Sequence, residues 1–223
     1  MATLAIAGAA AYSERKFSLK ELQQSLLAIS IPMVAGGIGI SMDYFGFSDY
    51  HESNLGLAYG KKLGASIDLG LSFNYSIIHI SGYGQTAAIE FGLGAIFHPT
   101  QKMQIGLDLY NPVGGQFGKQ ADEKMAWIYS LAIGYEISSQ VYFSLEWIKE
   151  ENQSIACKLA LQYQFAKQFN AGIGMLTSNA SPAAWAGWAW EKLSVQIHAS
   201  YHQQLGFSPG ISIGVDFGKS NDD

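Results

Sequence analysis

The ionisable residues that could do chemistry in this chain lie within segments where apolar and polar residues alternate. A period of two places successive side chains on opposite faces of a β-strand, so residues of one parity share a face. Nine ionisable residues share the face that otherwise carries Gly, Ser, Ala, Asn and Gln: Asp43, Asp68, Glu90, Asp108, Glu146, Lys158, His198, His202 and Asp216. For the carboxylates of this face two interpretations stay open, a hydrated or hydrogen-bonded surface and a role in selectivity.

Catalytic and metal-binding signatures are absent from the chain. His198 and His202 are four residues apart on one strand face, which separates them by about 13 Å, too far to share one metal ion. Gly60-Lys61-Lys62 lacks the upstream glycine spacing and the Ser or Thr of a phosphate-binding loop. We therefore expect a protein that is not an enzyme and that has no metal site and no cofactor.

The alternating pattern recurs along the whole chain and predicts about fourteen strands. In one clear example, Ile67, Leu69 and Leu71 alternate with Asp68 and Gly70. Most segments are near the 9–11 residues with which a tilted strand crosses a bilayer. The predicted segments are about 3–13, 22–31, 34–45, 53–60, 64–78, 85–98, 102–110, 124–136, 140–149, 154–166, 168–177, 183–190, 192–202 and 209–218.

The composition of the 223 residues favours strands that face lipid on one side. Charged residues make up 14%, well below the roughly 25% of soluble domains, while 25 residues are Gly and 13% are aromatic. Mean hydropathy is only +0.09, and the chain has no apolar run of about 20 residues, which excludes a bundle of membrane helices. The net charge of −5, without a cluster of Lys or Arg, argues against a nucleic-acid partner. The single Cys157 allows no internal disulfide and is expected to be a small apolar residue.

The connections between the segments alternate in length, short and then long. Short ones include 61–63 and 167–168, and long ones include 13–21, 46–52, 80–85, 111–123 and 203–209. Bacterial outer-membrane barrels have short periplasmic turns and longer outer loops, and closure leaves no strand edge unpaired in lipid. We therefore predict a closed antiparallel transmembrane β-barrel of about 14 strands in the bacterial outer membrane, in contact with outer-membrane lipid.

Aromatic residues near the segment ends share the apolar, outward parity and predict two girdles at the membrane interfaces. The predicted girdle residues are Tyr59, Phe97, Tyr135, Phe165, Trp190 and Phe217 near the short turns, and Tyr44, Tyr75, Trp127, Trp147 and Tyr201 near the long loops. The longest outer loop, 111–123, has one apolar anchor, Phe117. A lid folded into the barrel mouth and a solvated loop both fit this sequence.

The first residues, Met1 to Ala10, lack the basic region of a secretory signal, which a barrel bound for the outer membrane needs. We expect that a signal peptide and the natural N-terminus are missing upstream, that residues 1–218 form one barrel, and that 219–223 form a short tail.

Three stretches carry a resemblance to a known group: Gly56-Leu-Ala-Tyr-Gly-Lys-Lys-Leu-Gly64, Tyr110-Asn-Pro-Val113 and Tyr201-His-Gln-Gln-Leu-Gly-Phe-Ser-Pro209. The chain resembles uncharacterised outer-membrane barrels of Bacteroidota related to the PorV/PorQ type, which are similar to the FadL family of hydrophobe transporters. These stretches are turn and strand-end patterns, and no ligand-binding residue is carried over with them. Members of this group begin their barrel after an Asn-Pro-Ala-x-Leu-Ala stretch, whose second half Ala2-Thr-Leu-Ala5 matches.

Two functions follow as expectations. The first is passive transport of a small hydrophobic compound through the barrel, as the FadL resemblance and the Gly-rich inner face imply. The second, implied by the PorV/PorQ resemblance, is an accessory barrel that transports nothing and binds other outer-membrane proteins of a secretion or assembly complex. An outer-membrane enzyme is disfavoured because the chain has no clustered Ser, His and Asp set.

Overall fold

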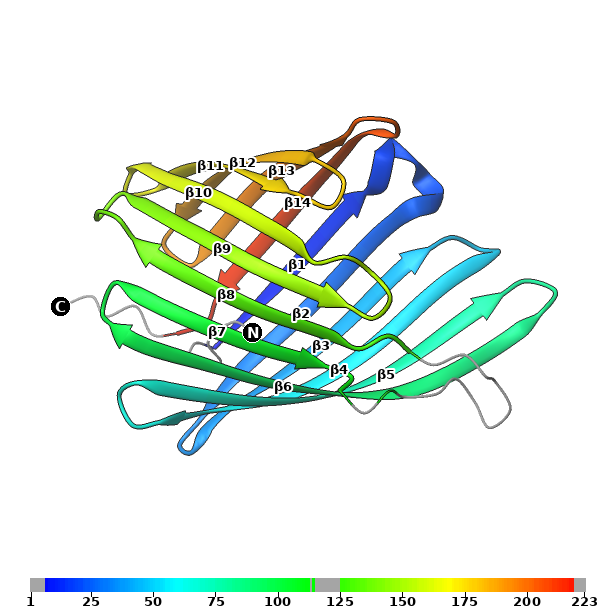
Figure 1. Cartoon of the computed structure of the whole chain (residues 1–223), viewed down its shortest axis with the longest axis horizontal. Coiled ribbons are helices and arrows are strands. Elements are labelled where there is room, and N and C mark those ends of the chain that lie inside the picture. Colours follow the sequence, from blue (N-terminus) through cyan, green and yellow to red (C-terminus); the bar gives the residue numbers. More distant parts are fainter. Residues whose placement is uncertain (1–6, 113, 115–124, 219–223) are drawn as a thin grey trace.

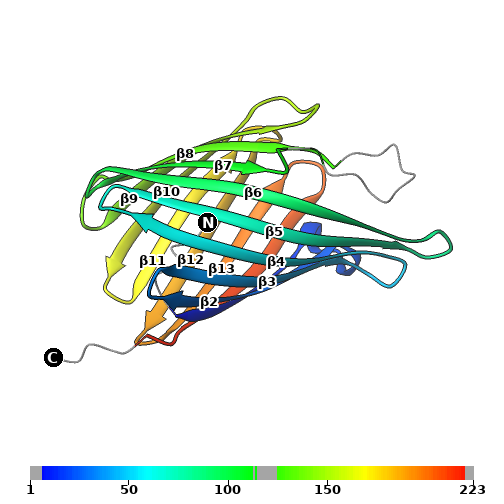
Figure 2. The same ribbon diagram turned by 90° about the horizontal axis from the view of Figure 1, so that it is seen from below.

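A computed structural model describes residues 7–112, 114 and 125–218, and it shows a closed barrel (Figures 1 and 2). The barrel strands, which number fourteen in this part of the chain, are β1 Gly8–Arg15, β2 Gln23–Met33, β3 Gly36–Gly46, β4 Tyr50–Leu63, β5 Ile67–Ile80, β6 Gly84–Thr100, β7 Met103–Tyr110, β8 Ile128–Glu136, β9 Val141–Glu150, β10 Ala156–Ala166, β11 Phe169–Leu176, β12 Ser181–Trp190, β13 Leu193–His202 and β14 Gly206–Asp216.

Each strand pairs antiparallel with its sequence neighbours, and β1 pairs with β14 to close the barrel. The closing register aligns Gly8 with Asp216 and Tyr12 with Ser212. Closure satisfies the backbone donors and acceptors of both edge strands, which no water could satisfy inside a bilayer. The predicted fold class is confirmed.

The strand ends differ from the prediction at both ends of the barrel. The short connection expected at 61–63 lies within β4, which continues to Leu63. β4 and β5 have 14 residues each and β6 has 17. The loops expected at 46–52 and 80–85 are therefore reduced to 47–49 and 81–83. The β5–β6 hairpin extends beyond the neighbouring strand ends (Figures 1 and 2). The longer strands are favoured because they form hydrogen bonds between backbone groups that would otherwise have only water as a partner in an irregular loop.

Burial is inverted relative to a soluble protein. Among the described residues, Ala88 is the only hydrophobic residue that is buried, whereas large apolar side chains of the outward parity are exposed along most of the strands. Leu71 is 56% exposed and Phe91 is 50% exposed, although both lie in the middle of their strands. A contiguous apolar surface of this extent requires lipid around it.

The β1–β2 connection contains two short 3₁₀ helices, η1 Lys16–Ser18 and η2 Lys20–Leu22. Phe17 and Ser18 have φ angles of 56° and 60°, which are unusual for residues other than glycine. Contacts with β14 hold them there: the Phe17 amide donates to Ser208 Oγ at 2.9 Å, and Ser18 Oγ donates to the Phe207 carbonyl at 3.0 Å. No helix within the described ranges is long and apolar enough to cross a membrane.

Candidate functional site

The lumen wall combines glycines with larger side chains that lie flat against the neighbouring strand. On β11, a Cβ at Gly172 would overlap the ring of Trp185, which is the residue opposite on β12. On β14, a Cβ at Gly210 would overlap the ring of His198, which is opposite on β13. Because glycine accepts these rings close to the wall, they occupy less of the lumen than upright side chains would.

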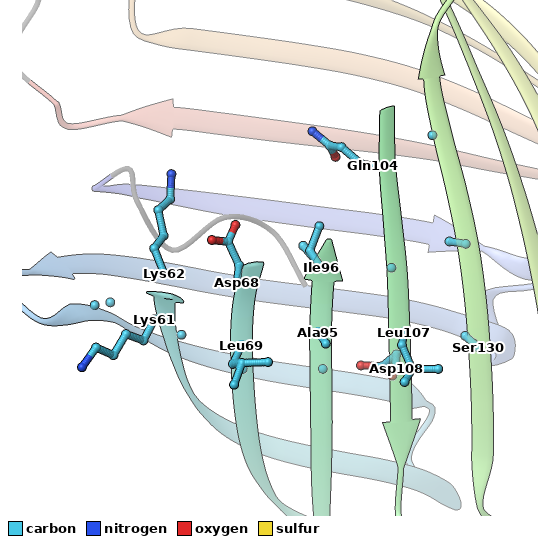
Figure 3. Close-up of a pocket in the computed structure, with 18 of the residues that line it drawn as sticks. Lys61, Lys62, Asp68, Leu69, Ala95, Ile96, Gln104, Leu107, Asp108 and Ser130 are labelled. Carbon is cyan, nitrogen blue, oxygen red and sulfur yellow. The ribbon is translucent and has the colours of Figure 1, made fainter. Parts of the chain in front are cut away.

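A cavity of about 680 Å³ lies against the wall formed by β2 to β9 (Figure 3). This size suits a small molecule. Lys62 and Asp68 point to one side of the wall in Figure 3, whereas Lys61 points to the other. The polar lining residues of the lumen parity are Lys62, Asp68, Gln104, Asp108, Ser130, Tyr142, Ser144 and Glu146. The rest of the lining consists of glycines, Lys61, apolar side chains of β5 to β8 such as Leu69, Ile96 and Leu107, and residues 32–35 at the β2–β3 connection.

Three of the carboxylates predicted from the sequence line this cavity: Asp68 on β5, Asp108 on β7 and Glu146 on β9. Asp68 Oδ2 lies 3.0 Å from Nε2 of His98, and the two side chains are 17% and 27% exposed. Glu146 lies 4.0 Å from Nζ of Lys158, the residue opposite it on β10. Among residues of the lumen parity, these three acids outnumber the two lysines Lys62 and Lys158, so the cavity favours positive charge.

A second acidic group lies toward the long-loop end, on β1 to β4. The Tyr12 hydroxyl donates to Glu14 at 2.6 Å, and Gln24 Nε2 donates to Asp43 at 3.0 Å. On β4, the Tyr50 hydroxyl donates to Glu52. Each carboxylate is therefore held by a neutral donor, which fixes its position without neutralising its charge.

The structure separates the remaining predicted residues into different environments. Glu90 on β6 is completely buried, next to the Ser76 hydroxyl, and no hydrogen bond of ordinary geometry reaches either carboxylate oxygen within the described chain. His202 Nδ1 accepts from the amides of Gln204 and Leu205 at 3.2 and 3.3 Å and so stabilises the β13–β14 turn. Asp216 Oδ1 accepts from the Gly218 amide at 2.7 Å. A further group lies apart from the cavity and contains Tyr12, His198, Glu14 and Asp43.

His198 and His202 lie four residues apart on β13. Within residues 7–112, 114 and 125–218, no group of three or more His, Cys, Asp or Glu side chains could hold a metal ion.

The residues predicted to form the aromatic girdles lie near the strand ends, on the outward parity. Most are between 37% and 59% exposed, namely Tyr44, Tyr59, Tyr75, Phe97, Tyr135, Phe165, Trp190, Tyr201 and Phe217. Trp127 and Trp147 are half-buried, and Trp127 stacks on Tyr129 with ring centroids 4.5 Å apart. Their anchoring role remains a prediction. The loop anchor Phe117 lies outside the described residues.

Several lumen residues were missed because their segments were short or weak in the sequence. Glu14 and Glu52 fell into predicted loops, although they lie in β1 and β4. Tyr12 and Trp185 lie in two of the least regular segments. With the correct strand ends, the alternation within each strand would have placed these residues on the lumen face.

Comparison with known proteins identifies the fold. No protein-family model matches the chain, and neither does any curated protein. The solved structures that it resembles include the Acinetobacter baumannii outer membrane protein Omp33 (TM-score 0.64, 8% identity, covering 96% of this chain and 100% of that one). They also include a Pseudomonas aeruginosa FadL homologue (TM-score 0.56, 10% identity, 96% and 90% covered) and the KdgM porin (TM-score 0.54, 11% identity, 95% and 99% covered). With its lipid-facing apolar surface, the chain therefore has the fold of a bacterial outer-membrane β-barrel of the porin type.

Proposed function

We propose that this barrel carries a small compound passively across the outer membrane, through its lumen. The observation that supports this most directly is the cavity of about 680 Å³ on the lumen side of β2 to β9. Its glycines leave room for a solute, and its side chains are charged on β4, β5, β7 and β9 and apolar at the β2–β3 connection.

The compound has substantial apolar surface, in line with the resemblance to FadL-type transporters. Pro32, Met33, Val34 and Ile96 are in the lining of the cavity. Such side chains favour an apolar body over a fully hydrated ion. The nearby carboxylates of Asp68 and Asp108 add a preference against anions.

The test is uptake into vesicles that contain the complete protein. We expect small aromatic compounds to enter these vesicles faster than empty ones, without any energy source, and to reach the external concentration. Uptake no faster than in empty vesicles would contradict the proposal.

A non-transporting accessory barrel of the PorV/PorQ type is the second candidate, and the β5–β6 hairpin favours it. Tyr83 at the hairpin tip is 91% exposed, on a hairpin that extends beyond its neighbours (Figure 1). An exposed aromatic on a projecting, regular hairpin suits contact with another protein. Native mass spectrometry of the protein extracted from its own membrane tests this. A stoichiometric protein partner whose binding is weakened by Tyr83→Ser would favour the accessory role.

A further inference from the structure

We propose that Tyr12 and His198, together with Glu14 and Asp43, form a recognition site for a small organic cation on the lumen wall. This inference rests on the proposed transport function and specifies its substrate class. The compound would have a positively charged amine and a flat, apolar body.

The rings of Tyr12 and His198 form the flat part of the site. Their planes differ by 2° and their centroids are 5.2 Å apart, although the residues belong to β1 and β13, on either side of β14. Gly210 on the intervening strand makes this possible, because any side chain there would overlap the His198 ring. The stack is therefore preorganised by the residues of the wall and does not need a ligand to form.

The negative part of the site follows from the register of β1, β2 and β3. Tyr12 lies opposite Leu26 on β2, and Leu26 lies opposite Asp43 on β3, so these three residues form one row across the wall. Glu14 is two residues further along β1, and its Oε2 accepts a hydrogen bond from the Tyr12 hydroxyl at 2.6 Å. The negative charges of Glu14 and Asp43 are both close enough to interact electrostatically with the Tyr12 hydroxyl.

No side-chain cation within the described residues forms an ion pair with Glu14 or Asp43. Lys16 lies near this end of the barrel, where its ammonium is 6.0 Å from the centroid of the Phe45 ring. The hydrogen bonds from Tyr12 and Gln24 orient the two carboxylates but leave their charges in place. Aromatic faces attract cations, and uncompensated carboxylates do so more strongly.

This combination distinguishes between ligand classes. An anion would be repelled by both carboxylates, and a neutral hydrophobe would gain nothing from them. An ammonium group gains from the ring faces and from the carboxylates, while its apolar body can lie on the rings. The carboxylates of the cavity, Asp68, Asp108 and Glu146, would favour the same charge further along the lumen.

The experiment compares three probes of one size, phenethylammonium, 2-phenylethanol and phenylacetate, on the complete barrel in detergent micelles. Equilibrium dialysis against detergent alone measures binding, and uptake into vesicles measures transport. We expect phenethylammonium to bind at least about tenfold more tightly than either other probe.

Variants locate the binding to this site. Tyr12→Leu should weaken binding of phenethylammonium about tenfold, and Asp43→Asn severalfold. Tyr12→Phe keeps the ring but loses the hydroxyl that orients Glu14, and should weaken binding less than Tyr12→Leu does. Trp185→Leu removes another lumen ring and should have no effect. A β-sheet circular dichroism spectrum identical to that of the original protein shows that each variant is folded.

The outcomes separate this inference from the proposed function. Equal binding of all three probes, or unchanged binding by folded Tyr12→Leu, would overturn the cation site even if uptake is observed. Selective binding that Tyr12→Leu weakens, without any uptake, would support the site and contradict transport.

Discussion

The two sides of the lumen wall use glycine in opposite ways. On the wall from β2 to β9, called the open wall below, glycines such as Gly70, Gly94 and Gly106 line the cavity, although Gly134 on β8 is covered by the Tyr142 side chain. From β11 to β14, Gly172 and Gly210 are covered by the rings of Trp185 and His198. Most glycines of the open wall thus leave space in the lumen, whereas Gly172 and Gly210 make room for large rings that lie against the wall. The difference shows that a glycine-rich face does not by itself mean an empty lumen.

The largest expected effect comes from adding side chains to the covered glycines. Gly172→Val places branched carbons where the Trp185 ring lies, so the ring must move into the lumen or the strands must separate. Overpacking of this kind costs about 1–3 kcal/mol. Denaturant unfolding of the barrel in detergent would measure the loss of stability.

Gly106→Ala on the open wall is the matched control for that change. The nearest side-chain atom to a Cβ at this position is the Cβ of Ala132 at 3.9 Å, an ordinary van der Waals distance. We expect a change in unfolding free energy below about 0.5 kcal/mol. Equal losses for the two variants would show that the walls do not differ as described.

A smaller effect is expected from neutralising the acids of the open wall. In the triple variant Asp68→Asn, Asp108→Asn and Glu146→Gln, the lumen loses three carboxylates from the lining of the cavity. The ratio of cation to anion permeability should fall severalfold, because the local field that concentrates cations is weakened. The reversal potential in a KCl gradient across a planar bilayer measures this ratio.

The control for the selectivity prediction is Asp216→Asn, at the short-turn end of β14. Its carboxylate accepts from the Gly218 amide and does not line the cavity. We expect an almost unchanged reversal potential. If this single change matched the triple variant, the selectivity would not depend on the cavity.

The smallest effect should come from the ion pairs of the open wall. Asp68→Asn removes the partner of His98 in a partly exposed pair, and the expected loss of stability is below about 1 kcal/mol. Lys158→Met should change stability less, because Lys158 is 61% exposed and its distance to Glu146 is 4.0 Å. Urea unfolding of both variants in detergent would compare them, and a loss above about 2 kcal/mol would contradict this order.

Much of the fold could be predicted because a barrel repeats one local rule. The alternation of Ile67, Leu69 and Leu71 with Asp68 and Gly70 places side chains on opposite faces in any strand, and the register keeps each parity on one side throughout the barrel. The prediction was weaker at the strand ends, because ladder pairing continues beyond the lipid, where apolar alternation is no longer required. For this reason Glu14 and Glu52 were assigned to loops.

The sequence alone determined the number of strands and the closed barrel, and it assigned a face to the charges inside the predicted segments, because a period of two and the need to pair every backbone group in lipid leave few alternatives. Only the tertiary structure decided which charges meet. Asp68, Asp108 and Glu146 share a cavity, whereas Tyr12 stacks on His198, 186 positions away in the sequence. The physical reason is closure: the β1–β14 register and the tilt of the strands fix which residues become neighbours, and neither is written in the local pattern of any one strand.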